Sequence, residues 1–302
     1  MKVLISGGTG MVGSALTASL RADGVTVNHL VRSKAKCAPG DVFWNPTAAT
    51  ADVEAMEGYD GVVHLSGASL AKGRWTRARK QVLRNSRVDT TRVLVDALSR
   101  LRQRPSVFVC ASGVGYYGNR GDEILTEGSG NGSDFLGLAC RAWEAEAARA
   151  AGAGIRTVVC RFGVILSAAG GALPVMAAPF KLGLGGRLGS GKQWMPWIAI
   201  EDAVGVVRTA IIEKSWSGPI NVVAPEPIQN AEFTRVLAGV LNRPAFLAVP
   251  TFALRIALGE MADEMLLVSQ RTEPAKLKTA GYRYRHESLE AALREILNKP
   301  SG

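Results

Sequence analysis

Three glycines near the start of the chain are spaced so that they could hold a phosphate group. Gly7, Gly10 and Gly13 follow the short apolar run of residues 3–5, which predicts a buried strand. The residues after Gly13 have the spacing of a helix that stops at Gly24. Glycine lets the backbone turn tightly and approach a pyrophosphate, which the free N–H groups of a helix N-terminus can bind. The stretch therefore predicts a dinucleotide-binding turn, and the alternative is a glycine-rich turn without a ligand.

A basic turn follows the next predicted strand, residues 25–31. It begins with Arg32 and Ser33 and continues with Lys34 and Lys36. An acidic residue near this point would hold the ribose 2′-hydroxyl of NAD, whereas a guanidinium attracts the 2′-phosphate of NADP. We therefore expect NADP as the cofactor, and the alternative is a basic turn on the surface.

Small or polar residues also follow two later strands. Gly67 and Ala68 come after residues 59–66 and would let the backbone pass close to a cofactor. Ser112 comes after the strand of residues 106–111 and is a candidate for a hydrogen bond to cofactor or substrate.

Strands and helices alternate through about residue 165. This order predicts a doubly wound parallel sheet with a nucleotide site at the carboxyl edge. The expected strands are residues 2–6, 25–31, 41–44, 59–66, 106–111 and 155–160, and the main helices are residues 74–104 and 134–151.

The pattern then changes. Residues 167–191 predict a glycine-rich functional loop. A helix over 201–214 and a strand over 219–223 extend the sheet domain, and helices are expected at 231–241, 252–268 and 288–297. We expect a Rossmann-type domain of residues 1–166 plus 201–224, and a smaller, mostly helical C-terminal lobe of residues 167–200 plus 225–302.

Composition narrows the class of protein. The chain has 302 residues, of which 47% are hydrophobic and 21% charged, as in globular proteins. No apolar run approaches the ~20 residues of a membrane helix, and we expect neither a signal peptide nor a membrane partner. The four cysteines lack metal-ligand spacing, so we expect no metal site and a reducing, cytoplasmic location.

The net charge of +10, from 36 basic and 26 acidic residues, favours anionic ligands. The arginines of residues 74–104 lack interleaved aromatic residues, so we interpret them as a solvated helix face and expect no nucleic-acid partner. The oligomeric state stays open.

Several longer motifs resemble the extended branch of the short-chain dehydrogenase/reductase superfamily, which holds the nucleotide-sugar epimerases and dehydratases. More narrowly, they resemble an atypical, epimerase-like family that ends in a domain of unknown function. The motifs, which span nearly the whole chain, are GGTGMVG (7–13), SGASL (66–70), SRVDTTR (86–92), ASGVGYYG (111–118), WEAEA (143–147), RFGVIL (161–166), PFKLGLGGRLGSGKQWMPWIAIEDAV (179–204) and, in looser form, residues 254–267.

The resemblance implies hydride chemistry with a Tyr-x-x-x-Lys pair, a Ser or Thr hydroxyl and an asparagine, where the lysine lowers the tyrosine pKa. This sequence departs from each part. Phe135 or Leu136 stands for the tyrosine, and Ala139 or Cys140 stands for the lysine. The hydroxyl position falls on Gly113, one residue after Ser112, and the asparagine position falls on Arg87.

Ser112 and Tyr116 are our candidate catalytic residues, because a serine hydroxyl and a phenol could replace the missing groups. The neighbouring Tyr117 also carries a phenol, but a packing role is the alternative to a catalytic one for this residue. Four basic residues could clamp an anionic substrate, although solvation is the favoured interpretation of each one taken singly: Lys80, Arg87, Lys181 and Lys192. His64 lies in an apolar strand and is expected to be a core residue.

We therefore expect an NADP(H)-binding oxidoreductase-like or epimerase-like enzyme with a small, anionic substrate. The alternative is a sensor or scaffold that holds NADP(H) without turnover. The predicted cofactor-binding residues are Gly7, Thr9, Gly10, Met11, Val12, Gly13, Arg32, Ser33, Leu65, Ser66, Gly67, Ala68, Arg87 and Phe162.

Overall fold

The computed structural model describes residues 1–298, and its centre is an eight-stranded sheet in the order β13-β8-β6-β5-β1-β2-β3-β4. Neighbouring strands are parallel except β4, which is antiparallel to β3. The predicted doubly wound parallel sheet is confirmed. The strands are β1 (Lys2–Ser6), β2 (Thr26–Val31), β3 (Val42–Asn45), β4 (Thr50–Ala51), β5 (Gly61–His64), β6 (Val107–Gly113), β8 (Arg156–Phe162) and β13 (Gly218–Val222).

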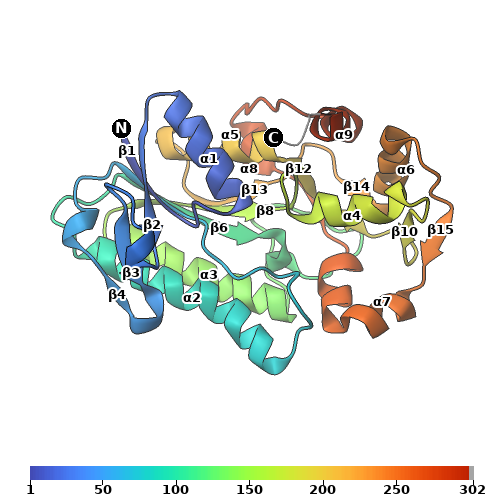
Figure 1. The fold of residues 1–302 in the computed structure, drawn as a ribbon, viewed down its shortest axis with the longest axis horizontal. Coiled ribbons are helices and arrows are strands. Elements are labelled where there is room, and N and C mark those ends of the chain that lie inside the picture. The colour runs from blue at the N-terminus through green and yellow to red at the C-terminus, as the bar shows by residue number, and fades with distance from the viewer. Residues whose placement is uncertain (299–302) are drawn as a thin grey trace.

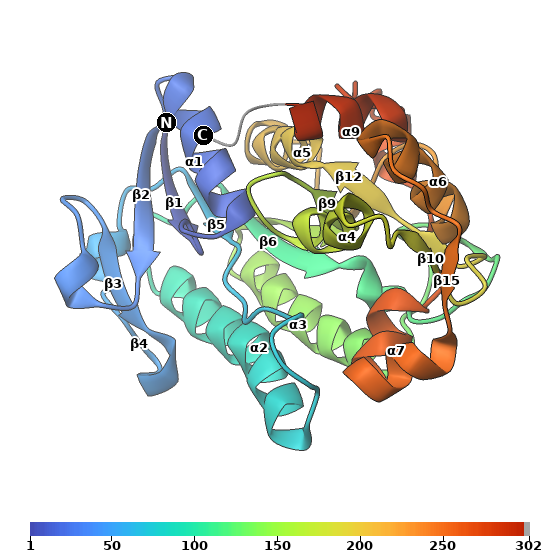
Figure 2. The ribbon, with the colours of Figure 1, turned by 45° about the vertical axis from the view of Figure 1, so that its right-hand side comes forward.

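Two helix layers cover this sheet, one on each face (Figures 1 and 2). α2 (Arg77–Ser99) and α3 (Phe135–Gly152) lie side by side on one face, and α1 (Met11–Ala22) and α5 (Ile200–Ile212) lie on the other. Since each central strand is covered on both faces, its residues form a continuous apolar run.

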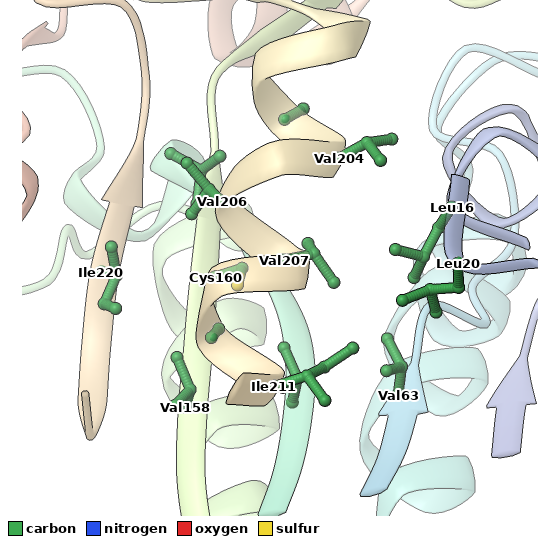
Figure 3. Close-up of a cluster of buried hydrophobic side chains, with 14 of the residues drawn as sticks. Leu16, Leu20, Val63, Val158, Cys160, Val204, Val206, Val207, Ile211 and Ile220 are labelled. Carbon is green, nitrogen blue, oxygen red and sulfur yellow. The ribbon is translucent and has the colours of Figure 1, made fainter. Parts of the chain in front are cut away.

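The cores on the two faces use alternate residues of the same strands. In β6, Val107 and Val109 pack toward α1 and α5, whereas Phe108 and Cys110 pack toward α2 and α3. Figure 3 shows the first of these cores, in which side chains of α1 and α5 lie among those of the strands. This two-sided burial fixes the positions at which the parallel strands end.

Most of the C-terminal elements, including α4 (Ala172–Lys181), α6 (Asn230–Leu241) and α7 (Thr251–Leu258), lie at one end of the molecule, whereas α8 (Ala275–Thr279) lies against β13 (Figure 1). The helix α9 (Leu289–Asn298) follows α8 along the chain. The core of this part includes Leu166, Leu173, Trp197, Phe233 and Leu293, all buried. The short paired strands are β9 (Val164–Leu166) with β12 (Trp197–Ala199), β10 (Gly186–Leu188) with β15 (Leu247–Val249), β11 (Trp194–Met195) with β14 (Ile228–Gln229), and β7 (Ile124–Leu125) with β16 (Arg271–Thr272).

Two sequence predictions are wrong in this part. The expected loop over 167–191 contains α4 and β10, and α4 was missed because its residues ALPVMAAPFK are apolar all round and show no helical period. The expected helix over 252–268 breaks at Gly259, whose positive φ of 64° ends α7 before the π-helical turn Ala262–Leu266.

The proposed domain division stays a prediction, and its residues 299–302 lie outside the described residues. Leu277 of α8 returns to the core beneath α5, so the C-terminal part is also tied to the sheet. Within residues 1–298, no helix has the length and apolar character needed to cross a membrane.

Candidate cofactor and active site

The glycine turn joins β1 to α1 and leaves the start of that helix open. Gly7 has a φ of +74°, and its carbonyl accepts the Gly10 N–H at 3.0 Å. A Cβ on Gly13 would lie 2.2 Å from the Gly7 carbonyl oxygen, so only glycine fits there. Within the described chain, no side chain caps α1 and no acidic residue lies in its first turn. This end can therefore accept an anion.

The other predicted residues of this turn lie around it. Thr9 is exposed, and Met11 and Val12 are partly buried against the core. A Cβ on Gly171 would lie 3.0 Å from the Met11 Sδ, which places the start of α4 against the turn. The structure thus brings a segment of the C-terminal part to the glycine turn.

The segment after β5 passes close to the same turn. A Cβ on Gly7 would lie 2.8 Å from the Leu65 carbonyl carbon, and Ser66 follows directly. Gly67 is exposed, and the Ala68 N–H donates to the Ser86 Oγ at 3.0 Å. The predicted residues of β1 and β5 therefore meet at one edge of the sheet.

Arg87 supports this segment from α2. Its Nη2 donates to the Ala68 carbonyl at 3.1 Å and its Nη1 to the Leu83 carbonyl at 3.0 Å, and its guanidinium lies 5.4 Å from the Trp143 ring. Burial lowers the pKa of Arg87 below its ordinary value. Arg87 forms no ion pair with a carboxylate anywhere in residues 1–298. An enclosed cation without a carboxylate partner favours a bound anion.

Arg32 and Ser33 lie at the end of β2 and are exposed. In the part of the chain that the structure describes, Arg32 forms no ion pair. The His29 ring packs under Gly8, where an added Cβ would lie 2.2 Å from the ring, and it hydrogen-bonds with the Thr17 Oγ1 at 3.1 Å. The glycine turn thus rests on β2, and Arg32 is free to meet a ligand at that strand end.

A buried polar network closes the carboxyl ends of β6 and β8. The Ser112 Oγ donates to the Glu144 Oε1 at 2.7 Å. Arg161, only 3% exposed, donates to both oxygens of Glu144, at 2.9 and 2.8 Å. Arg161 Nη1 also donates to the Tyr117 hydroxyl at 3.0 Å, and that hydroxyl donates to the Asn221 Oδ1 at 2.6 Å. Each hydrogen-bonding group of this set has a protein partner.

The network shifts the pKa values of Arg161 and Tyr117. The bidentate contact with Glu144 raises the pKa of Arg161, although burial alone would lower it. Burial raises the pKa of Tyr117 to about 12. Tyr117 therefore stays a neutral phenol at neutral pH, which agrees with the packing interpretation of this residue.

Tyr116 is half-buried beside the network. The Arg161 guanidinium carbon lies 3.5 Å from the centre of its ring. Its hydroxyl makes no hydrogen bond within the described chain, unlike that of Tyr117. Tyr116 and Glu144 line one end of a hollow of about 820 Å³ that runs between α3 and the edge strand β13. Of the two predicted catalytic residues, Tyr116 is therefore the one with a free hydroxyl.

The candidate positions of the missing Tyr-x-x-x-Lys pair are apolar. Leu136 is buried against Gly115, whereas Phe135 is partly buried. Ala139 and Cys140 are buried, and Cys140 lies beside Ser112 and Arg87. Burial raises the pKa of the Cys140 thiol to about 11, so it is neutral at neutral pH. None of these side chains can replace a phenol or an ammonium. Phe162, at the end of β8, contributes only apolar packing.

A second, polar hollow of about 580 Å³ lies between the C-terminal elements and the start of α3. Its lining includes two basic and four acidic side chains: Lys192, Arg255, Asp122, Asp134, Asp263 and Glu264. Glu264 accepts the N–H groups of Phe135 and Leu136 at 3.2 and 2.8 Å, so the C-terminal part caps α3. Lys80, another proposed anion clamp, is paired with Glu260 at 2.8 Å.

Comparison with known proteins now identifies the family. A sequence model described as "NAD dependent epimerase/dehydratase family" matches residues 3–223. The chain belongs to this family. A second model, described as "Domain of unknown function (DUF1731)", matches residues 249–296. The predicted resemblance, including its C-terminal domain, is confirmed.

Members of the family are similar to this chain over its whole length. An epimerase family protein of Mycobacterium bovis is 42% identical over 298 residues, covering 99% of this chain and 98% of that protein. Human epimerase family protein SDR39U1, in a crystal structure with NADPH, is 36% identical with a TM-score of 0.90, covering 98% of this chain and 99% of that one. A nucleoside-diphosphate sugar epimerase structure from Corynebacterium glutamicum is 38% identical with a TM-score of 0.81, covering 98% of this chain and 58% of that one.

The structure brings together most of the predicted cofactor residues, around the turn between β1 and α1 and the segment after β5. Sequence reasoning missed Glu144, Arg161 and Glu264 as partners of the site residues. The motifs WEAEA and RFGVIL contain the first two, but spacing alone could not show that the two residues meet. Within residues 1–298, no group of three or more His, Cys, Asp or Glu residues could hold a metal ion.

Proposed function

We propose that this chain binds NADP(H) and is an oxidoreductase-like or epimerase-like enzyme that acts on a small molecule. The observation that carries the proposal is the uncapped N-terminus of α1, framed by Gly7 and Gly13, which no larger residue can replace. The NADPH named for the human relative supports the choice of cofactor.

The residues present fit this dinucleotide. The first N–H groups of α1 would bind the pyrophosphate, and Gly7, which has no room for a side chain, lets the backbone of the turn pass close to Leu65. Arg32 would pair with the 2′-phosphate at the end of β2. Arg87 would supply a second positive charge beside Gly67 and Ala68, where the protein itself provides no carboxylate within the described residues.

Bound NADPH would supply a hydride to a carbonyl group. The chain would then have to provide a proton for the developing alkoxide. The Ser112 proton already points to Glu144, so Tyr116 is the better donor. Because no lysine holds a phenolate ready, reduction of a carbonyl should be favoured over oxidation of an alcohol at neutral pH.

A panel of carbonyl compounds with NADPH tests this chemistry. Any compound that is reduced should be reduced about 10²–10⁴-fold more slowly by Tyr116→Phe if Tyr116 is the donor. Ser112→Ala is the matched comparison, since it removes a hydroxyl of the closed network and should mainly lower stability. If Tyr116→Phe matches the parent on a reduced substrate, the donor assignment is wrong.

One observation favours a second function, an NADP(H)-binding sensor or scaffold. Apolar Phe135 or Leu136 stands at the family position of the phenol, and Ala139 or neutral Cys140 at that of the ammonium. Tight NADPH binding without reduction of any carbonyl compound would favour this alternative.

The charge of the substrate is also a proposal, as is the cellular compartment of the protein. Arg87 favours an anion, whereas the polar hollow carries four carboxylates against Lys192 and Arg255. We propose a cytoplasmic location because the four cysteines are free thiols. One relative, from Arabidopsis thaliana, is named as chloroplastic.

A further inference from the structure

Large apolar side chains are unevenly distributed over the surface. Among the described residues, seven large apolar side chains that are 38–79% exposed fall within residues 175–184 and 246–256. We call them the apolar patch: Val175, Leu182, Leu184, Phe246, Leu247, Phe252 and Ile256. The other exposed ones, such as Val82 on α2 and Ile212 on α5, are scattered singly, which is normal for a folded protein.

The elements that carry the apolar patch are neighbours. β10 pairs with β15, with Gly186 opposite Leu247. α4 leads into β10 and β15 leads into α7, and Figures 1 and 2 show these four elements at the same end of the molecule. The pairing of β10 with β15 brings Leu182 and Leu184 close to Phe246 and Leu247, and the other three side chains lie on the adjoining helices α4 and α7.

Helix α4 shows why this region is unusual. Its inner face buries Leu173, Ala177 and Phe180. Its outer face also lacks polar residues, since Pro174 and Val175 are exposed there and the first charged residue is Lys181 at the end. A helix that is apolar on both faces is expected to be covered on both.

Three exposed basic residues lie on the segments that carry the apolar patch, and within the described chain Lys181, Arg187 and Arg243 form no ion pair. Residues 172–200 and 242–258 contain no Asp or Glu. Their two other basic residues, Lys192 and Arg255, face the carboxylates of the polar hollow. A second copy of this chain would bring like charges together across the contact. An anionic surface would instead gain both apolar burial and attraction to the three exposed basic side chains.

We propose that the apolar patch docks on the surface of an anionic lipid bilayer. None of its seven side chains lines either of the two hollows described above. Protruding Phe, Leu and Ile side chains with Lys and Arg beside them can enter the headgroup region without a matching protein shape. The proposed contact is peripheral and differs from the sequence-based expectation of no membrane partner.

Sedimentation with vesicles tests the proposal on the full chain. The protein should sediment with vesicles of equal parts phosphatidylglycerol and phosphatidylcholine, and much less with phosphatidylcholine alone. The double variant Phe246→Ser/Phe252→Ser should bind the anionic vesicles about tenfold more weakly or less. The matched control is Val82→Ser, which removes an exposed apolar side chain from α2 and should bind as the parent does.

Charge and folding are tested separately. Lys181→Gln and Arg243→Gln should each weaken binding to anionic vesicles roughly fivefold. NADPH affinity is the control for folding, and it should be the same in all these variants as in the parent. Equal binding to both vesicle types, or no binding to either, would overturn the proposal. A dimer in solution that the double variant abolishes would instead identify a second copy as the occupant.

Discussion

The glycine turn and the Ser112–Arg161 network lie at the same edge of one sheet, but they differ in how their polar groups are satisfied. At the turn, α1 begins without a cap, and Arg32 and Arg87 have no carboxylate partners within the described chain. In the network, Ser112 and Arg161 both meet Glu144. The first region has donors that need a ligand, whereas the second is complete without one.

This difference separates binding from stability. Groups left unpaired in the fold are available to a ligand, and groups paired inside it mainly hold the strand ends together. Substitutions in the network should therefore lower the free energy of unfolding. Substitutions of Gly10 or Arg32 should lower cofactor affinity and leave stability nearly unchanged.

The largest effect is expected for Glu144→Ala. This substitution leaves the buried Arg161 guanidinium without its carboxylate and should lower the free energy of unfolding by about 3–5 kcal/mol. Denaturant unfolding measures it. The matched control is Glu146→Ala on the same helix, because Glu146 pairs with the exposed Arg92 and Arg149 and should contribute at most about 1 kcal/mol. Similar losses in the two variants would contradict the distinction.

Next comes Gly10→Val, which should weaken NADPH and NADH binding about a hundredfold or more. Gly10 has an ordinary φ of −77°, and a Cβ there would lie 3.3 Å from the Gly7 oxygen, so the variant should fold. Calorimetric titration and a melting curve check both statements. Gly152→Ala is the control, since nothing lies within 4 Å of its Cβ position. Parent-like affinity in a folded Gly10→Val protein would show that the turn does not hold the cofactor.

A smaller effect concerns pH and His64. This residue is fully buried, hydrogen-bonded with the Ser6 Oγ at 2.6 Å, and burial lowers its pKa from 6.5 to about 3. As pH falls below 6.5, His64 becomes protonated in the unfolded chain but stays neutral in the folded chain. His64 should therefore lower the free energy of unfolding by about 1.4 kcal/mol per pH unit, down to about pH 3. His64→Gln should flatten this slope, and equal slopes would count against a neutral buried imidazole.

The sequence predicts those parts of the molecule that local patterns determine. Apolar runs identify the central strands, and the glycine spacing identifies the turn at Gly7. It could not predict that the Ser112 proton is taken by Glu144, because the two residues are 32 positions apart on different elements. The bond between Tyr117 and Asn221 spans 104 positions and is equally invisible to spacing. Helix α4 was missed for a different reason, because it has no polar face to reveal its period.

The central claim is that the glycine turn between β1 and α1 binds NADP(H), and that Arg32 at the end of β2 recognises its 2′-phosphate. Titration of the parent and of Arg32→Ala with NADPH and NADH tests it most directly. NADPH should bind the parent more tightly than NADH, and Arg32→Ala should reduce that difference by roughly 1.5–3 kcal/mol while leaving NADH affinity unchanged. Equal affinities of the parent for the two dinucleotides, or an unchanged difference in the variant, would contradict the account.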